Sequence, residues 1–277
     1  MLIQNPVFER PPVAEVALAV FLERPLQLQS AQLGRLWELW RDQFPVTQDQ
    51  PPMPPVPVET FPAAPMVMPF QFIGSYPGPR VWFSSKGGDR LIQVQSDRLV
   101  LNWRRTKMDD EYPHYEKLRP SFVELLTTFL AHLEREGIGP VVFSQAEVNY
   151  INPIPYPALG TPANISLLVA PWSGVFSDEY LPLPEDVRLQ LRFPILNPVD
   201  GNAVGRLYVE CNSAFHKNVG ETSQSEVYML QLFSRGTPLG DGVDGAMAFL
   251  DLGHEYVVNG FVSLTTQEIK KVWGYKT

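Results

Sequence analysis

The sequence has only one cysteine, Cys211, in 277 residues. A single thiol cannot form an internal disulfide, and a reducing compartment is the simplest interpretation. No apolar run approaches the roughly 18 residues that a membrane span needs. Residues 1–10 also lack the basic and apolar segments of a secretory signal. We therefore expect a cytoplasmic protein with no membrane contact.

Positive charge is also scarce, because 22 Lys and Arg residues face 30 Asp and Glu residues, giving a net charge of −8. A field of this sign repels phosphate backbones, so nucleic-acid binding is disfavoured unless a local basic patch overcomes it. The composition, 44% hydrophobic and 19% charged, is typical of globular proteins. A chain of this length can bury a sizeable core without a disulfide or a structural metal.

Motifs for catalysis or cofactor binding are almost absent. The run Gly240-Asp241-Gly242-Val243-Asp244-Gly245 has GxGxxG spacing. A dinucleotide site needs a second parallel strand after the helix that follows such a run. Here a helical pattern and then a capping box follow, so we interpret the run as a turn with Asp244 as N-cap. We expect no cofactor.

One helical segment carries three residues that could ligate a metal. Asp251, His254 and Glu255 lie one turn apart, but no second histidine stands four residues from His254, as helical zinc sites require. A hydrogen-bonded, partly buried histidine is the preferred interpretation. The acidic run 109–111 is similarly assigned to a helix N-terminus, where carboxylates are favourable. A metal-dependent hydrolase using either group remains an alternative.

Hydrophobic periodicity predicts an α+β fold with antiparallel sheets. A strand at 15–22 and a helix at 33–44 come first, and a capping box at Thr265 and Glu268 is expected to start a short last helix. Further strands are predicted at 69–73, 81–84, 91–95, 99–103, 144–151, 165–169, 187–195, 207–211 and 227–234, and further helices at 115–133, regular from Pro120, and at 244–263.

Each half of the chain reads as an antiparallel meander followed by a long amphipathic helix. This pattern predicts two lobes, at 1–155 and 163–277, separated by prolines. Nine prolines also lie between Pro45 and Pro69. Proline fixes φ and removes a donor, so 45–69 is expected to be an extended surface loop over the first lobe. The alternative is a ligand for an aromatic groove.

Basic and aromatic residues alternate near the junction of the predicted strand 99–103 and the next helix. Such a mixture can grip phosphates and stack bases. Acidic residues dilute the patch, and Trp103 is in phase with the core. Nucleotide or nucleic-acid binding is therefore an alternative here, carried by Arg98, Arg104, Arg105 and Lys107 with Tyr112 and Tyr115.

Several short motifs follow one another along the chain: Pro11-Pro12-Val13-x-Glu15-Val16, Leu91–Gln95, Asn102-Trp103-Arg104, Tyr112-Pro113-x-Tyr115, Phe122, Glu147, Tyr150-x-Asn152, His254, Phe261 and Trp273. In this order they resemble a family of uncharacterised, sporadically distributed bacterial proteins of similar length. The resemblance implies a bacterial cytoplasmic protein and supplies no catalytic residue. Its scattered distribution hints at an accessory role such as defence.

The resemblance draws attention to four polar residues in strands: Glu15, Asn102, Glu147 and Asn152. Buried polar groups cost free energy unless they are paired. A hydrogen-bond network that fixes the first lobe is preferred over a ligand-facing cluster. We expect a non-enzymatic binding module whose partner is a protein or a second copy. Its candidate binding residues are Glu15, Asn102, Arg104, Arg105, Tyr112, Tyr115, Glu147 and Asn152.

Overall fold

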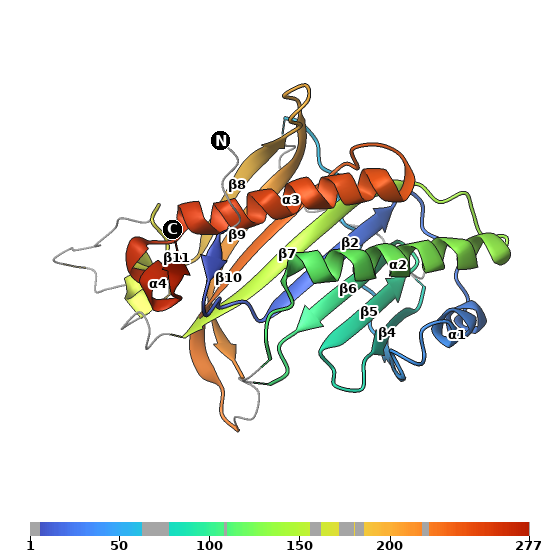
Figure 1. Cartoon of the computed structure of the whole chain (residues 1–277), viewed down its shortest axis with the longest axis horizontal. Coiled ribbons are helices and arrows are strands. Elements are labelled where there is room, and N and C mark those ends of the chain that lie inside the picture. The colour runs from blue at the N-terminus through green and yellow to red at the C-terminus, as the bar shows by residue number, and fades with distance from the viewer. Residues whose placement is uncertain are drawn as a thin grey trace.

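The computed structural model describes residues 6–62, 78–107, 110–155, 162–171, 180, 186–217 and 222–276 (Figure 1). The strands are antiparallel and the helices lie outside the sheet, which confirms the α+β class. The elements are β1 (Val7–Phe8), β2 (Glu15–Leu22), α1 (Ser30–Glu38), β3 (Val46–Gln50), β4 (Arg80–Ser84), β5 (Arg90–Gln95), β6 (Arg98–Arg104), α2 (His114–Arg135), β7 (Phe143–Pro155), the 3-10 helix η2 (Pro162–Leu167), β8 (Leu189–Leu196), β9 (Ala203–His216), β10 (Ser225–Gly236), α3 (Gly242–Leu264), α4 (Gln267–Val272) and β11 (Tyr275–Lys276).

One nine-stranded sheet joins both halves of the described chain, in the order β3-β4-β5-β6-β2-β7-β10-β9-β8. The expectation of a separate sheet in each half is therefore corrected. The reason is the pairing of β2 with β7, in which Glu15 faces Ile151 and Leu18 faces Val148. Each of these strands has hydrogen-bonding groups on two edges, so one edge remains available to join the halves.

The connectivity of the second half repeats that of the first. In each half the last strand pairs with the first, β6 with β2 and β10 with β7, and a long helix follows. The two first strands meet at the middle of the sheet. Helices α2 and α3 lie across the same face of the sheet (Figure 1), and α3 contacts β7, β10 and β9.

Alternation along the strands separates the two faces of the sheet. In β2, Val16 and Leu18 point into the main core beneath the helices, as the period-two pattern predicts. Ala19 and Phe21 point to the other face, yet they are also buried, in a small second cluster with Val100. Both faces near the centre of the sheet are thus covered.

The second face is covered by residues 51–62, which we call the proline strap. The Gln95 side chain accepts from the Met53 amide at 2.8 Å and donates to the Met53 carbonyl at 2.9 Å. Gln145 accepts from the Glu59 amide at 3.0 Å and donates to the Pro57 carbonyl at 3.1 Å.

The strap continues beyond the first half of the sheet. Arg206 on β9 binds both the Glu59 carboxylate and the Thr60 carbonyl. The prediction of a loop at 45–69 over the first lobe is thus corrected in two respects: Val46–Gln50 form the edge strand β3, and residues 51–62 cross strands of both halves. Residues 63–69 of the expected segment, and the strand predicted at 69–73, lie outside the described residues.

Two element boundaries that were predicted from prolines are wrong. Helix α2 begins at His114 and contains Pro120, because burial of Tyr115 and Leu118 extends the apolar stripe before it. Strand β7 does not end at Pro153 but includes it and Pro155. The backbone nitrogens of Pro153 and Pro155 point toward the edge of β7 that pairs with β2. The β2–β7 pairing begins only at Ile151, so these two prolines remove no hydrogen bond from the sheet.

Three further expectations are corrected. Residues 165–169 do not form a strand, because η2 occupies Pro162–Leu167 and only Val169 makes an isolated bridge. The N-cap of α3 is Asp241, one turn before the expected Asp244. The last helix is capped by Thr266, whose hydroxyl accepts from the Ile269 amide at 3.3 Å, and not by Thr265.

The glycine-rich run has a packing explanation. A Cβ on Gly245 would lie 2.0 Å from the Gly240 carbonyl oxygen, and Gly242 has a φ of +58°. The chain therefore needs glycine at both positions to turn tightly into α3. With an antiparallel sheet around it, the run does not have the parallel-strand setting of a dinucleotide site.

Candidate functional site

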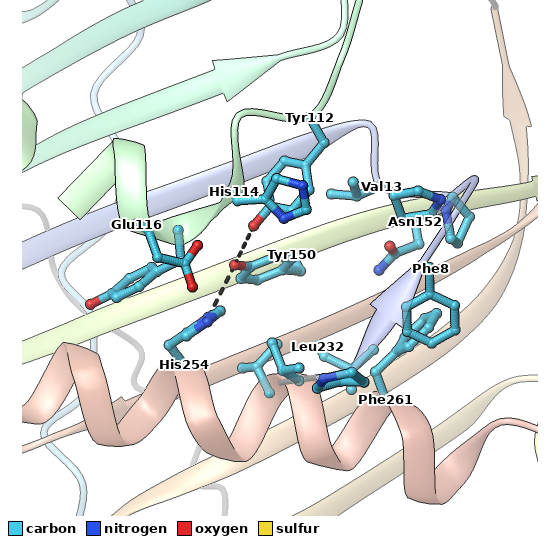
Figure 2. A pocket seen from close by; sticks show the side chains of 16 residues that line it. Phe8, Val13, Tyr112, His114, Glu116, Tyr150, Asn152, Leu232, His254 and Phe261 are labelled. Atoms are coloured by element: carbon cyan, nitrogen blue, oxygen red, sulfur yellow. Dashed lines mark hydrogen bonds between the residues drawn. The ribbon is translucent and has the colours of Figure 1, made fainter. Parts of the chain in front are cut away.

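A pocket of about 110 Å³ opens between the first turn of α2, the middle of α3 and the N-terminal segment (Figure 2). We call it the tyrosine–histidine pocket. Its polar groups come from α2, β7, α3 and Tyr112 just before α2, and its apolar wall includes Phe8, Val13, Leu232 and Phe261. It adjoins the middle of the sheet, where the two halves meet.

Three side chains from distant parts of the sequence form a hydrogen-bonded chain in this pocket. The Tyr112 and Tyr150 hydroxyls are 2.7 Å apart, and the Tyr150 hydroxyl is 3.1 Å from His254 Nδ1 (Figure 2). Tyr150 belongs to the helix-facing side of β7, opposite Val16 of β2. The β2–β7 register therefore determines where the chain lies.

Stacking fixes the imidazole at the end of this chain. The Tyr115 ring lies parallel to the His254 ring, with centroids 4.1 Å apart and planes 9° apart. Tyr115 is held in turn, because its hydroxyl donates to Asp251 at 2.8 Å. Arg119 donates to the same carboxylate at 2.7 and 2.8 Å. The α2–α3 interface thus positions His254.

The hydrogen-bonded chain is uncharged at neutral pH. Burial lowers the pKa of His254 to about 4, and it raises the pKa of Tyr112 and of Tyr150 above the usual tyrosine value. The proton on a neutral imidazole occupies one of its two nitrogens. The remaining donor hydrogen therefore lies at one end of the chain, on His254 Nε2 or on the Tyr112 hydroxyl.

Backbone strain accompanies the pocket at its rim. His114, the first residue of α2, has a φ of +60°, which is uncommon for a residue with a Cβ. Its exposed ring lies 4.8 Å from the Tyr112 ring, centroid to centroid. Such strain persists only where surrounding contacts impose it, and it is concentrated at functional sites.

A larger cleft of about 1010 Å³ adjoins the pocket at the end of the sheet. The two share walls made by Phe8, Pro11, Pro12, Tyr112 and His114. Pro153 and Pro155 of β7 also line the cleft, where β2 has not yet begun. Its cationic residues are Arg10, Arg104, Arg105, Lys107 and Lys217, and its acidic residues are Glu9, Glu15, Asp110 and Glu111.

The four polar strand residues singled out by the sequence do not form one cluster. Asn102 donates to Glu15 at 2.6 Å on the strap side of the sheet, where Glu147 also pairs with Arg235 at 2.7 Å. Asn152 instead lies on the helix side, lines the tyrosine–histidine pocket and donates to the Leu230 carbonyl at 3.0 Å.

The basic residues proposed for phosphate binding also separate. Arg98 is buried against Asp97 and donates to the Pro54 carbonyl at 2.7 Å, so it is not exposed to a ligand. Arg104 lies 3.3 Å from Glu15 and stacks over Trp82. Arg105 and Lys107 line the cleft. Trp103 is buried in the core, as its phase predicts.

Metal ligation is not favoured by what the candidate residues contact. Asp251 is bound by Tyr115 and Arg119, and His254 Nδ1 by Tyr150. Within the described ranges, no three His, Cys, Asp or Glu side chains group in a way that could hold a metal ion. Asp109 of the acidic run lies outside these ranges, and the Asp110 carboxylate accepts from the Thr106 and Lys107 amides, each at 2.8 Å.

The sequence placed Tyr112, Tyr115 and Asn152 among the candidates, and all three line the pocket. It missed Tyr150 as a functional residue, although the Tyr150-x-Asn152 motif contained it. For His254 it preferred a hydrogen-bonded, partly buried residue over a metal ligand, and the structure confirms that preference without the sequence having named a pocket there. One pattern in the sequence could have indicated Tyr150. Side chains alternate between the two faces of a strand, so Tyr150, two residues from Asn152, lies on the same face of β7.

No protein-family model matches the chain, and a search of curated proteins finds no match. Among the described residues, no helix is both long and apolar enough to cross a membrane. The pocket and the cleft are therefore the features of the molecule that indicate a function.

Proposed function

We propose that the chain is a non-enzymatic binding module whose ligand occupies the tyrosine–histidine pocket. The observation that carries this proposal is the uncharged Tyr112–Tyr150–His254 chain beside an apolar wall. Ligand sites commonly combine an apolar lining with a few convergent polar groups. The ligand proposed here is a small molecule. The protein partner or second copy expected from the sequence stays a prediction.

The size of the pocket limits the buried part of the ligand. A dry protein cavity of about 150 Å³ accommodates benzene. At about 110 Å³ this pocket is smaller than that cavity but open to the surface, so one aromatic ring or a short branched chain is the largest group it could take. A hydroxyl or carbonyl on that group would bond the donor hydrogen left at an end of the polar chain.

The protonation states argue for binding rather than catalysis. A general acid or base works best when its pKa lies near the operating pH. Burial holds the pKa of His254 at about 4 and that of Tyr150 well above its usual value. Neither group changes charge near pH 7, so the pocket can orient a ligand without readily transferring a proton.

The test is binding of p-cresol, which carries one ring and one hydroxyl, followed by calorimetry and by amide shifts in NMR. We expect saturable binding to the wild type and its loss in Val258→Phe, because Val258 lines the pocket. The control is Val142→Phe, at an exposed position outside it. Equal binding by both variants, or no binding by the wild type, would contradict the proposal.

The proposal retains the expected cytoplasmic location and the resemblance to the bacterial family, both of which rest on the sequence. A role in defence rests on that resemblance alone. Nothing in the p-cresol experiment depends on either.

A further inference from the structure

The tyrosine–histidine pocket and the cleft adjoin, share five lining residues and differ in chemistry. Tyr112 and His114 stand at their junction and line both. The inner part has an apolar wall and an uncharged polar chain, whereas the outer part carries five cationic residues. A molecule longer than one ring would therefore pass from an apolar into a charged environment.

More of the acidic residues than of the cationic residues in the cleft belong to ion pairs. Glu15 faces Arg104 at 3.3 Å, and Glu9 pairs with Lys276 at 3.1 Å. Of the cleft's cations, Arg105, Lys107 and Lys217 make no ion pair with any described residue, while Arg10 donates only to a backbone carbonyl at 3.2 Å. These four outnumber the two acids left in the cleft, Asp110 and Glu111.

The five cationic and four acidic residues of the cleft give it one net positive charge, in contrast to the net charge of −8 on the whole chain. A local positive potential favours an anionic ligand. Arg105 lines the cleft, but its Nε is buried and has no hydrogen-bond partner among the described residues, so only the rest of its guanidinium group could contact a ligand.

The first turn of α2 also faces this junction. The residue before it, Pro113, provides no side-chain cap, and amides in the first turn of a helix favour negative charge. Glu116, in the same turn, lines the inner pocket and opposes an anion placed deep inside it. The favourable place for an anion is consequently the cleft beside Arg105 and Lys107.

We propose that the ligand is an amphipathic anion whose single ring enters the tyrosine–histidine pocket while its carboxylate or phosphate binds in the cleft near Arg105 and Lys107. This inference rests on the proposed function and specifies its ligand class. The shared chemistry is a small apolar group joined to one anionic head.

The test compares benzoate, phenylacetate and 3-phenylpropanoate with 3-phenylpropanamide and phenyl phosphate, using calorimetry on the full chain. The series varies the distance between ring and head, because the pocket and the cleft are successive spaces. We expect the best carboxylate to bind about tenfold more tightly than the amide, as a charge-assisted contact adds that much. Raising the salt concentration should reduce this advantage.

Arg105→Gln and Lys107→Gln should each remove most of the advantage of the acid while leaving amide binding unchanged. Arg188→Gln is the matched control, since Arg188 is exposed and pairs with Asp186 away from the cleft. Phenyl phosphate binding more tightly than every carboxylate would assign the head group to phosphate, and the reverse order to carboxylate.

Two outcomes overturn the inference in distinguishable ways. Equal affinity for 3-phenylpropanoate and its amide would refute the anionic head and leave the ring-binding pocket intact. Absence of binding by every compound, p-cresol included, would refute the proposed function and this inference together.

Discussion

On the strap side of the sheet, Glu15 and Asn102 bond to each other and Glu147 bonds to Arg235. On the helix side, Tyr150 and His254 bond to each other beside an open pocket. The strap side carries charged residues that have partners, and the proline strap lies across them. The helix side carries an uncharged hydrogen-bonded chain beside the tyrosine–histidine pocket.

The two faces offset the free-energy cost of burying polar atoms in different ways. Ions removed from water need partners, and the strap face provides ion pairs together with hydrogen bonds to the strap backbone. The helix face avoids the cost, because the tyrosines Tyr112 and Tyr150 are uncharged at neutral pH in any environment and burial lowers the pKa of His254 to about 4. The ion pairs and hydrogen bonds of the strap side hold the strap on the sheet, whereas the neutral polar chain of the helix side can bond to a ligand in the pocket.

The largest effect is expected from removing one partner of the most buried ion pair on the strap face. Arg206 and Glu59 have side-chain exposures of 10% and 5%, and Tyr208 also donates to Glu59 at 2.6 Å. Arg206→Ala leaves the Glu59 carboxylate buried without its counter-charge. We expect the free energy of unfolding to fall by about 3–5 kcal/mol, measured by urea denaturation.

Two comparisons control this measurement. Replacing both residues, Arg206→Met with Glu59→Leu, should recover most of the stability, because no buried charge is left. Arg188→Ala removes an exposed pair, with side-chain exposures of 75% and 44%, and should cost under about 0.5 kcal/mol. An Arg206→Ala cost as small as that of Arg188→Ala would show that the strap face is not held by this pair.

The helix face should respond to pH through His254. Its folded-state pKa, about 4, lies below the ordinary value of 6.5, so the unfolded chain binds a proton first as pH falls. Stability should therefore decrease as pH falls from about 6.5 to about 4, by up to about 3 kcal/mol from this group. Glu116 and Asp251 oppose the shift and keep it from being larger.

Urea denaturation at several pH values measures this loss, and His254→Gln should reduce the slope in that window. Carboxylates elsewhere contribute equally to both proteins. A native-state NMR titration that gave His254 an ordinary pKa would contradict the prediction and remove the argument that the pocket is uncharged by burial.

A smaller effect is expected from Tyr150→Phe, which removes the middle hydroxyl of the polar chain. Tyr112 and His254 Nδ1 then lose a shared partner inside the pocket. We expect a loss of about 1–2 kcal/mol in the free energy of unfolding. Tyr256→Phe is the control, because its hydroxyl accepts from the exposed Leu196 amide at 3.2 Å, and it should cost under about 0.5 kcal/mol. Equal costs would mean that the chain contributes no stability.

Much of the secondary structure could be predicted because it depends on local periodicity. The strand 15–22 and the strands at 91–95 and 99–103 agree closely with β2, β5 and β6. Two errors concern prolines. Pro120 is tolerated inside α2 because neighbouring buried residues hold the helix, and Pro153 is tolerated inside β7 because the edge to which its nitrogen points is unpaired there. Residues 165–169 have strand-like composition but pair with no strand among the described residues beyond one bridge at Val169, and η2 includes the first three of them.

The candidate site was predicted only in part, for a reason that lies in distance along the chain. Tyr112 and Asn152 were singled out, but the residues that join them are far apart in the sequence. His254 stands 104 positions after Tyr150. No local pattern connects them, because their contact depends on α3 packing across β7.

The sequence by itself determined the α+β class, most strands and helices, and the polar character of Glu15, Asn102, Glu147 and Asn152. The tertiary structure decided which of these residues share a surface. Alternation along β7, a local property, already places Glu147 and Asn152 on opposite faces. The pairing of β2 with β6 and β7, which no local pattern specifies, decided that Glu147 shares its face with Glu15 and Asn102, whereas Asn152 lines the candidate site.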